Sequence, residues 1–492
     1  MLRNAAVLLL AALAVAGPAG AKGKEGASLD GWWSARVEHG GESRFLYLRF
    51  ANRDGRATAS FSIPEIGAQE SPLGRYAVGE NEIKLPDAGW TLRIEDGGET
   101  LAGQLPGALV PVYPLQARFR RSAAPEAEPD PSGYQAAPAP LWRRQVEGAV
   151  YGGPAYDRRS GLLFIAADSG KVYGLRATTG ALAWSVSVGS PVRSTPAVEA
   201  GALFVAADKA LVKLDARSGR PLWTAPLGVE RHKRLEIGDR NSLWDHYGAS
   251  PVIRGKHAYV GSRDGCLYAF ETTSGRQARR ICTEGQITAT PVVADGRLFF
   301  ASFDGHVYAA RLTDGAILWK RDARGAVPRD LALAGGRILA GSRSYDLLAL
   351  DPESGRPEWT RYVWFSWIDS PPLVSAGKLY IGSSDSRRVF ALDSASGRPL
   401  WTTRVPGWAW ARPAAGATAV YAGAVGTTGR YVGRRDGALA AIDRRDGRLR
   451  WRLDVASPKG AALHGFAAAP LVAGGRLYAA DLSGTVYAFK DR

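Results

Sequence analysis

Short apolar runs alternate with glycine-containing turns through most of the chain. One copy of this pattern reads "RVFALDSASGRPLW" at 388–401, and another reads "HVYAARLTDGAILW" at 306–319. Each has an apolar run, a turn and a second run that usually ends in Trp, and seven copies lie between residues 171 and 451. Runs this short, bounded by turn residues, predict β-strands and not helices. A recurrence of about forty residues indicates a repeat architecture.

A glycine stands at the same place in the turn of every copy. A residue with positive φ is expected there, and only glycine adopts that conformation without strain. The seven glycines are Gly180, Gly219, Gly275, Gly315, Gly355, Gly397 and Gly447. A second hairpin precedes each copy, as in "TPVVADGRLFFASFDG" at 290–305. Each unit therefore has four short strands, and units that cannot bury both faces alone stack around an axis as a β-propeller.

The last copy, "GRLYAADLSGTVYAFKDR", ends before its turn and its second strand. The letters of that strand occur instead at 139–145, where "APLWRRQ" contains Pro140, Leu141 and Trp142. Pairing of this segment with the C-terminal strand would close the ring and remove two exposed edges. The sequence therefore predicts an all-β fold in which residues 141–492 form an eight-bladed propeller closed by an N-terminal outer strand.

Residues 28–121 differ from the repeats and predict a separate small domain. The stretch "GWWSARVEHGGESRFLYLRFANRDGRATASFSI" alternates apolar and polar residues around tight turns. This pattern is typical of an antiparallel meander, so we expect a small β-barrel or sandwich. Residues 122–140 are rich in Pro and Ala with several acids, and they predict an extended linker.

The N-terminal residues 1–21 have the features of a secretory signal peptide. Arg3 precedes a short apolar run, and the small residues Ala19, Gly20 and Ala21 follow it. No cysteine follows as a site for a lipid anchor, and no other apolar run reaches the length of about 18 residues that a membrane-spanning helix needs. We therefore expect a periplasmic or secreted protein without a membrane anchor.

The formal net charge of +16 changes this picture little. The basic residues are scattered, no long basic run is present, and no nucleic-acid-binding motif is found. Nucleic acid is thus not an expected partner. An exported basic protein can bind an anionic envelope polymer or an acidic protein, so we expect an envelope protein or glycan as partner, and a monomeric chain.

The repeat units resemble the pyrroloquinoline quinone (PQQ) repeats of eight-bladed propellers in the quinoprotein alcohol dehydrogenase-like superfamily. The resemblance covers residues 141–492 and implies the fold directly. It does not imply one function, because the superfamily contains quinone-dependent alcohol dehydrogenases and also non-catalytic members such as BamB, an outer-membrane assembly scaffold. The chain is most similar to the BamB-like members.

The resemblance also implies which residues a dehydrogenase of this kind would need. They are two adjacent cysteines beneath the cofactor, a Glu/Asn/Asp set around Ca²⁺ and an Asp base. Here Cys266 and Cys282 are not adjacent, Asn241 is the only asparagine after residue 140, and no Cys-x-x-Cys-His motif is present. These residues favour a non-catalytic binding scaffold without a bound cofactor, and a PQQ-dependent oxidoreductase with the quinone in the channel stays the alternative.

The two cysteines lie symmetrically around a turn, each eight residues from Ser274. In a regular hairpin they would lie opposite each other and could form a disulfide in an oxidising compartment. The same repeat has Arg279 where the others have Trp, so a disulfide could staple a blade that lacks its aromatic. Two buried free thiols are the other reading of this pair.

Large aromatic and polar side chains precede the first strand of several repeats, in the loops where a propeller gathers residues around its channel. We expect them to form a ligand- or partner-binding rim, since aromatic faces suit sugars, planar ligands or an inserted peptide. They are Trp244, His246, Tyr247, Gln286, Trp364, Trp367, Asp369, Trp408, Trp410 and His464. The alternative is that they plug the channel mouth or pack between blades. Six scattered histidines show no ligand spacing, so no metal site is expected.

Overall fold

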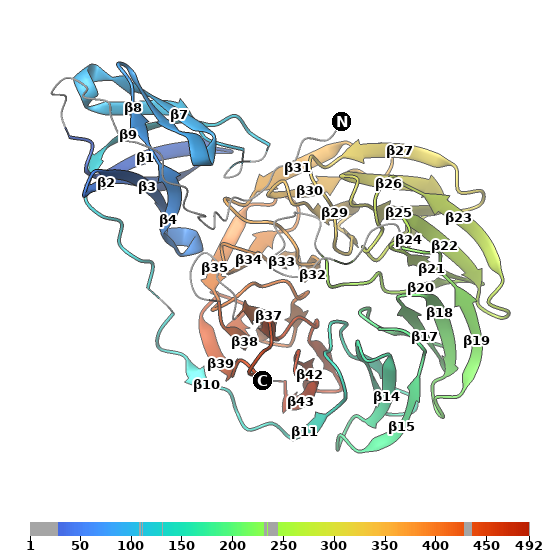
Figure 1. The fold of residues 1–492 in the computed structure, drawn as a ribbon. Helices are drawn as coiled ribbons and strands as arrows, with labels where there is room; N and C mark the ends of the chain where they lie inside the picture. Colours follow the sequence, from blue (N-terminus) through green and yellow to red (C-terminus); the bar gives the residue numbers. More distant parts are fainter. Residues whose placement is uncertain are drawn as a thin grey trace. The chain divides into compact units, whose positions relative to one another are not determined.

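The computed structural model describes residues 28–107, 110, 112–129, 131–230, 234, 245–427 and 435–491, so the expected signal peptide lies outside the described residues. The described chain is almost entirely β-structure and divides into two compact units. One is built on residues 28–129 and the other on residues 131–491. Figure 1 shows the second unit as a ring of blades, with strands coloured from cyan to red around the axis.

The first unit is one nine-stranded antiparallel sheet that curls into a nearly closed barrel. Its strand order is β4-β3-β2-β1-β9-β8-β7-β6-β5. The strands are β1 (Gly31–His39), β2 (Glu42–Arg53), β3 (Arg56–Ile63), β4 (Ala68–Arg75), β5 (Ala77–Val78), β6 (Glu82–Leu85), β7 (Trp90–Glu95), β8 (Thr100–Gln104) and β9 (Gln116–Ser122). Three short 3-10 turns lie between them, at η1 (Pro64–Ile66), η2 (Pro86–Ala88) and η3 (Asp96–Gly98).

The alternation in the sequence places one side of each strand inside this barrel. In β1, Trp33, Ala35 and Val37 are buried, and Trp33 pairs with the buried Leu48 of β2. Phe119 of β9 completes the same core. The expected small antiparallel β-domain is thus present, as a barrel and not as a sandwich.

The second unit is an eight-bladed propeller of four-stranded antiparallel blades, as the repeats predict. Blades 1 to 4 contain β12 (Ala155–Asp157), β13 (Leu162–Ala166), β14 (Lys171–Arg176) and β15 (Leu182–Ser187); β16 (Ala197–Glu199), β17 (Ala202–Ala207), β18 (Ala210–Asp215) and β19 (Pro221–Pro226); β20 (Val252–Arg254), β21 (His257–Gly261), β22 (Cys266–Glu271) and β23 (Gln277–Cys282); and β24 (Val292–Ala294), β25 (Arg297–Ala301), β26 (His306–Arg311) and β27 (Ile317–Asp322). Blades 5 to 7 contain β28 (Ala332–Ala334), β29 (Arg337–Gly341), β30 (Asp346–Leu350) and β31 (Pro357–Tyr362); β32 (Leu373–Ser375), β33 (Lys378–Gly382), β34 (Arg388–Asp393) and β35 (Pro399–Arg404); and β36 (Ala414–Ala415), β37 (Ala419–Thr427), β38 (Gly437–Asp443) and β39 (Leu449–Val455). A short strand, β40 (Leu463–Gly465), pairs with the end of β37.

Blade 8 combines the two ends of the propeller sequence. Its strands are β41 (Leu471–Ala473), β42 (Arg476–Ala480), β43 (Thr485–Lys490) and, from the N-terminal side, β11 (Trp142–Gln145). β11 runs antiparallel to β43, with Trp142 opposite Ala488 and Gln145 opposite Thr485. The predicted closure is therefore confirmed, and it supplies the outer strand that the C-terminal repeat lacks.

The repeated tryptophan and glycine contact each other across neighbouring blades. The indole of Trp184 in blade 1 covers Gly219 of blade 2, and its Nε1 donates to the Ala216 carbonyl at 3.2 Å. Trp142 makes the same contact with Gly180 and donates to the Ala177 carbonyl at 3.1 Å. The seven turn glycines all have positive φ. The motif therefore fixes each outer strand to the next blade.

The linker is held against the propeller over part of its length. β10 (Gln135–Ala136) pairs in parallel with β39 and adds a fifth strand to the outer edge of blade 7. The Ala137 N–H donates to the Arg452 carbonyl at 3.1 Å, and the Arg452 guanidinium lies 4.6 Å from the ring centre of Tyr134. The propeller therefore begins near residue 134, before the boundary at 141 that the repeats suggest.

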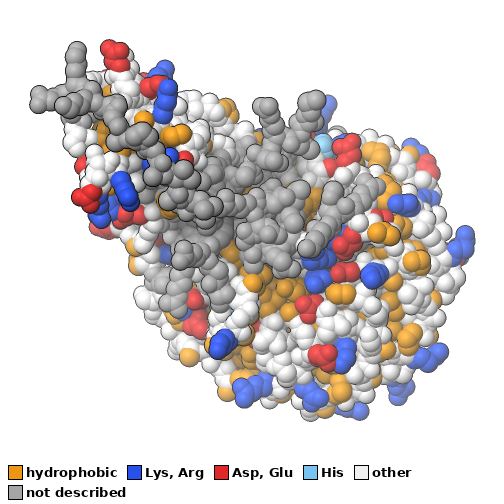
Figure 2. Space-filling model, viewed as in Figure 1, with side chains coloured by type: hydrophobic (Ala, Val, Ile, Leu, Met, Phe, Trp, Pro, Cys, Tyr) orange, Lys and Arg blue, Asp and Glu red, His pale blue; other side chains and the backbone are white. Residues whose placement is uncertain are grey.

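The charged side chains are scattered over the surface, as the sequence predicts. On the face that Figure 2 shows, lysine and arginine side chains lie among acidic and apolar ones instead of gathering in one patch. Among the described residues, no helix has the length and apolar character needed to cross a membrane.

Candidate functional site

The loops that lead from the outer strand of one blade to the inner strand of the next surround the propeller axis. We call the described parts of these segments the interblade loops; they lie within 146–154, 188–196, 227–251, 283–291, 323–331, 363–372, 405–413 and 456–470. The structure places nine of the ten expected rim residues in them. The tenth, Trp244, lies outside the described residues.

The ends of these loops are joined by hydrogen bonds from blade to blade. The Gly153 N–H donates to Thr195 Oγ1 at 2.8 Å, and the Thr195 N–H donates to Ser250 Oγ at 3.0 Å. The Ser250 N–H donates to Thr290 Oγ1 at 2.9 Å, and the Thr290 N–H donates to Asp330 Oδ1 at 3.0 Å. Each side chain satisfies a backbone donor of the preceding blade, so the loops of blades 1 to 5 hold one another in place.

A cavity of about 510 Å³ lies on the axis between these loops and the inner strands of blades 6 to 8. Its apolar wall comes from Leu373 and Val374 of β32, Ala414 of β36, and Leu471 and Val472 of β41. The volume is in the range of sites that hold a small organic ligand. The cavity is thus a candidate binding site.

The rest of the wall is mixed, with aromatic and cationic side chains among hydroxyl residues, glycines and one aspartate. Tyr151 and Tyr247 line it together with Arg193, Arg329 and Arg412. The Arg329 guanidinium lies 3.3 Å from the ring centre of Tyr247, a cation–π contact. These three arginines are not among the expected site residues, because they come from three different loops and the sequence gives no sign that they meet.

Tyr247 crosses the axis from blade 3. Its hydroxyl donates to the Ala467 carbonyl of the loop before blade 8 at 3.3 Å. Burial raises the pKa of this hydroxyl well above its ordinary value, so the group stays protonated and remains a donor. The ring of Tyr151 packs edge-on against Tyr247 and stacks on His246 with ring centres 5.7 Å apart. These rings pack against one another around the axis, in agreement with the alternative that residues of the rim plug the channel mouth.

A buried network of ion pairs surrounds His246. Asp245 accepts from Arg234 at 2.7 Å and also pairs with Arg263, while Arg193 and Arg234 both pair with Asp208. Burial, together with the positive charge of nearby arginines, lowers the pKa of His246 to about 3. His246 is therefore neutral at ordinary pH, and it is a packed side chain rather than an exposed binding group.

Trp367 and Asp369 share one arginine. Arg343 pairs with Asp369 through two hydrogen bonds, Nε to Oδ1 at 3.2 Å and Nη2 to Oδ2 at 2.9 Å. The same guanidinium lies 4.6 Å from the ring centre of Trp367. Trp367 is half-buried, and it is the only one of the nine described rim residues that is not buried.

The other three tryptophans of the described rim are structural. Trp408 is 1% exposed and stacks on Trp410 with ring centres 4.5 Å apart. Their indole nitrogens donate to Asp385 Oδ1 at 3.0 Å and to Ser384 Oγ at 3.1 Å, both in the neighbouring loop of blade 6. Trp364 packs edge-on against Tyr362. All three are buried, which agrees with the alternative that these residues pack between blades, and their role in binding a ligand stays a prediction.

The last two rim residues are also buried. Gln286 Oε1 accepts from Arg263 at 3.0 Å, and His464 Nε2 accepts from the Gly437 N–H at 3.2 Å. Burial lowers the pKa of His464. Both residues therefore connect loops of adjacent blades and leave little surface for a ligand.

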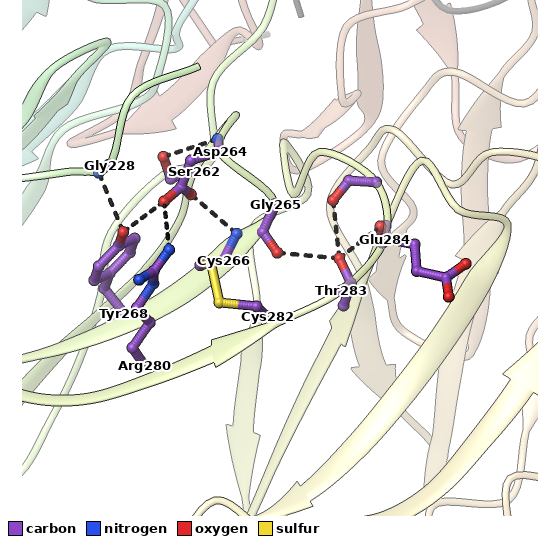
Figure 3. The surroundings of a disulfide bond; sticks show 12 residues. Gly228, Ser262, Asp264, Gly265, Cys266, Tyr268, Arg280, Cys282, Thr283 and Glu284 are labelled. Atoms are coloured by element: carbon purple, nitrogen blue, oxygen red, sulfur yellow. Dashed lines mark hydrogen bonds and ion pairs between the residues drawn. A yellow bond between two sulfur atoms is a disulfide. The ribbon is translucent and has the colours of Figure 1, made fainter. Parts of the chain in front are cut away.

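The cysteines of blade 3 are joined by a disulfide, with Cα atoms 4.0 Å apart (Figure 3). Cys266 of β22 lies directly opposite Cys282 of β23, because the bulge in this strand pair lies beyond them, at Ala269 and Phe270. Cys266 is buried and its N–H donates to Asp264 Oδ1 at 3.0 Å. Asp264 Oδ2 also accepts from Tyr268 at 2.5 Å.

The described residues do not fit a quinone site with Ca²⁺. No group of three or more His, Cys, Asp or Glu side chains that could hold a metal ion is found in the described part of the chain. Both cysteines are engaged at the outer strand pair of blade 3, away from the axial cavity, and none lines that cavity. The described residues therefore do not assemble the donor set that the dehydrogenase resemblance implies.

Comparison with known proteins assigns the family. A family model described as outer membrane protein assembly factor BamB matches residues 134–245, 233–330 and 304–492. The chain belongs to this family. The matched region begins at residue 134, where β10 joins the propeller.

Solved structures support the fold. BamB from Moraxella catarrhalis is 19% identical with a TM-score of 0.52, and the match covers 72% of this chain and 97% of that protein. Quinohemoprotein alcohol dehydrogenase from Comamonas testosteroni is 13% identical with a TM-score of 0.55, over 72% of this chain and 76% of that protein. At these identities the similarity shows the propeller and not a shared activity.

One curated relative is an enzyme. The 1-butanol dehydrogenase (cytochrome c) of Thauera butanivorans is 32% identical over 123 residues, which are 24% of this chain. The match spans only 16% of the dehydrogenase. The similarity is therefore local, and it does not extend over the rest of that protein.

Proposed function

We propose that this BamB-like propeller is a non-catalytic scaffold of the bacterial cell envelope, exported through its N-terminal segment, that holds a protein or other ligand. The description of its family, an outer membrane protein assembly factor, supports such a role. The sequence features of residues 1–21 support export. In this proposal the propeller is the binding platform.

One observation carries the non-catalytic part of the proposal. The side chains around the axis are packed against each other: Tyr247, His246 and Tyr151 form one aromatic cluster, and Asp369 is held by Arg343. A dehydrogenase of this superfamily would need free carboxylates there to hold Ca²⁺ and to take a proton. Here Asp245 and Asp369 are both committed to arginines.

The second candidate is a PQQ-dependent oxidoreductase. The local similarity to 1-butanol dehydrogenase and a cavity of about 510 Å³ on the axis favour it. The cavity wall contains arginines that suit an anionic ligand. The described carboxylates do not complete a Ca²⁺ site, so this reading ranks second.

Deletion of the gene in the bacterium that carries it separates the two functions. The scaffold role predicts less folded outer-membrane protein in isolated membranes and unchanged PQQ-dependent alcohol oxidation in extracts. In parallel, the purified protein should neither take up PQQ in the presence of Ca²⁺ nor reduce a dye with butan-1-ol. Normal outer-membrane protein levels together with stoichiometric PQQ uptake and turnover would replace the scaffold by the oxidoreductase.

Fractionation of cells that express a tagged chain tests the location. The protein should be released with periplasmic contents or remain with the envelope, and its N-terminus should be processed near Ala21. A full-length chain found only in the cytoplasm would contradict the proposed role.

A further inference from the structure

The axial cavity contains more positive charge than its neighbours neutralise. Arg193 is paired with Asp208 at 2.7 Å. Arg329 lies on the ring of Tyr247, and its Nε has no hydrogen-bond partner. Asp330 is the acidic residue in the cavity wall, and its Oδ1 accepts from the Thr290 N–H. With Arg193 neutralised, two guanidinium groups in the wall face one carboxylate.

Arg412 is the second of these groups. It occupies the position before the inner strand of blade 7, where blades 2 to 4 have hydroxyl side chains that accept from a neighbouring backbone N–H. An arginine cannot accept such a bond. Its side chain is exposed to the cavity, and it makes no hydrogen bond or ion pair with any other residue that the structure describes.

Part of the cavity wall is apolar. Leu373, Val374, Leu471 and Val472 come from inner strands, pack against the cores between the blades and remain partly exposed at the cavity wall. A cationic group beside unfilled apolar surface suits a ligand with a charged head and an apolar body. Guanidinium groups prefer oxyanions, and they bind carboxylates through two parallel hydrogen bonds.

We infer that the axial cavity binds a small organic acid, with its carboxylate at Arg412 and Arg329 and its apolar body against β32 and β41. This inference rests on the proposed binding function and names the ligand class of the channel. It involves no covalent step and no metal. Asp245 and His246 do not line the cavity, and in this inference they hold the loops in place without contacting the ligand.

Isothermal titration of the full chain with three probes tests the inference. 2-Naphthoate has both the carboxylate and the apolar body, 2-naphthamide lacks the charge, and acetate lacks the body. We expect 2-naphthoate to bind with a dissociation constant below about 1 mM. The amide should bind about tenfold more weakly, and acetate should not bind measurably in the same range.

Two variants locate the site. Arg412→Ala should weaken 2-naphthoate by about tenfold and abolish its advantage over the amide. Arg445→Ala removes the same charge from the same blade at an 85% exposed side chain outside the cavity, and it should leave binding unchanged. Because Arg412 is exposed, both variants should keep the parent melting temperature.

Three outcomes would overturn the inference: equal affinity for the acid and the amide, equal losses in the two variants, or no binding of 2-naphthoate at millimolar concentration. None of them would affect the scaffold role, which is measured by outer-membrane protein levels. Conversely, PQQ uptake with alcohol turnover would overturn the scaffold role and leave the affinity difference between acid and amide as a separate result.

Discussion

The contact between the repeated tryptophan and glycine predicts how much stability the propeller loses when the glycine is replaced. Gly219 lies in the turn before β19 with φ of 74°, and a Cβ built there would lie 2.5 Å from Cε3 of Trp184. Its three nearest heavy atoms all belong to that indole. Gly219→Ala therefore combines a strained backbone with a steric clash between blades 1 and 2.

Gly201→Ala separates these two contributions. Gly201 is in the same blade with φ of 78°, but a Cβ there would meet nothing within 4 Å. Placing an L-residue in this conformation costs about 1–2 kcal/mol. Overpacking at a tight contact adds about 1–3 kcal/mol. Gly219→Ala should thus lower the free energy of unfolding by about 2–5 kcal/mol, and Gly201→Ala by about 1–2 kcal/mol.

Urea unfolding, followed by circular dichroism, measures both losses. Gly219→Ala in a protein that also carries Trp184→Ala completes a double-mutant cycle, because removing the indole removes the clash. Gly219→Ala should then cost no more than Gly201→Ala, which gives a coupling energy of about 1–3 kcal/mol. Equal losses for the two glycines in the parent protein, or an unchanged cost without the indole, would refute the interpretation of the motif as a contact between blades.

Three further predictions concern other parts of the propeller. A chain lacking residues 1–133 keeps β10 and β11, whereas a chain lacking 1–147 exposes the edge of β43; the second should melt at a lower temperature, and equal melting temperatures would contradict the closure. Reduction should raise the intact mass by two hydrogen atoms, and replacing both Cys266 and Cys282 with Ala should lower the free energy of unfolding by about 2–4 kcal/mol; an unchanged mass would exclude the disulfide. His246 has a folded pKa of about 3 against an ordinary 6.5, so below about pH 6.5 only the unfolded chain gains its proton, and stability falls with falling pH. Between pH 7 and 4.5 the parent protein should lose about 2–3 kcal/mol more than His246→Gln, as measured by urea unfolding, and parallel pH profiles would exclude a buried neutral His246.

The repeats predicted the propeller because the information for it is local. Each unit has its own turn glycine and its own apolar runs, and the contact between Trp184 and Gly219 needs only residues at fixed places in consecutive units. The closure by β11 could also be predicted, since its letters match those of the missing strand. β10 could not, because a two-residue strand held by backbone bonds and one arginine has no pattern of its own.

For the rim residues, the position in the repeat predicts the loop in which a side chain lies but not the neighbours that it contacts. The sequence places Trp367 and Trp408 in equivalent loops, and both lie there. It does not say which neighbour each ring faces. Trp408 turns toward Asp385 of the adjacent loop and is buried, while Trp367 lies beside Arg343 and stays half-exposed. That choice depends on residues of the preceding blade, which lie more than twenty positions away along the chain. In the same way, the meeting of Arg193, Arg329 and Arg412 at one cavity depends on three separate loops.

Blade 3 shows that the contact matters more than the residue that makes it. Arg279 replaces the usual tryptophan, and a missing aromatic suggested a weak blade that the disulfide would have to staple. The Arg279 guanidinium instead donates to the Leu312 carbonyl at 2.7 Å and also to Thr313, and its stem covers Gly315. The arginine thus supplies both parts of the tryptophan's role, a donor to the next blade and a cover for its turn glycine. The disulfide lies at the opposite end of the same strand pair, where Cys266 faces Cys282, and it acts on the β22–β23 hairpin rather than on the junction between blades.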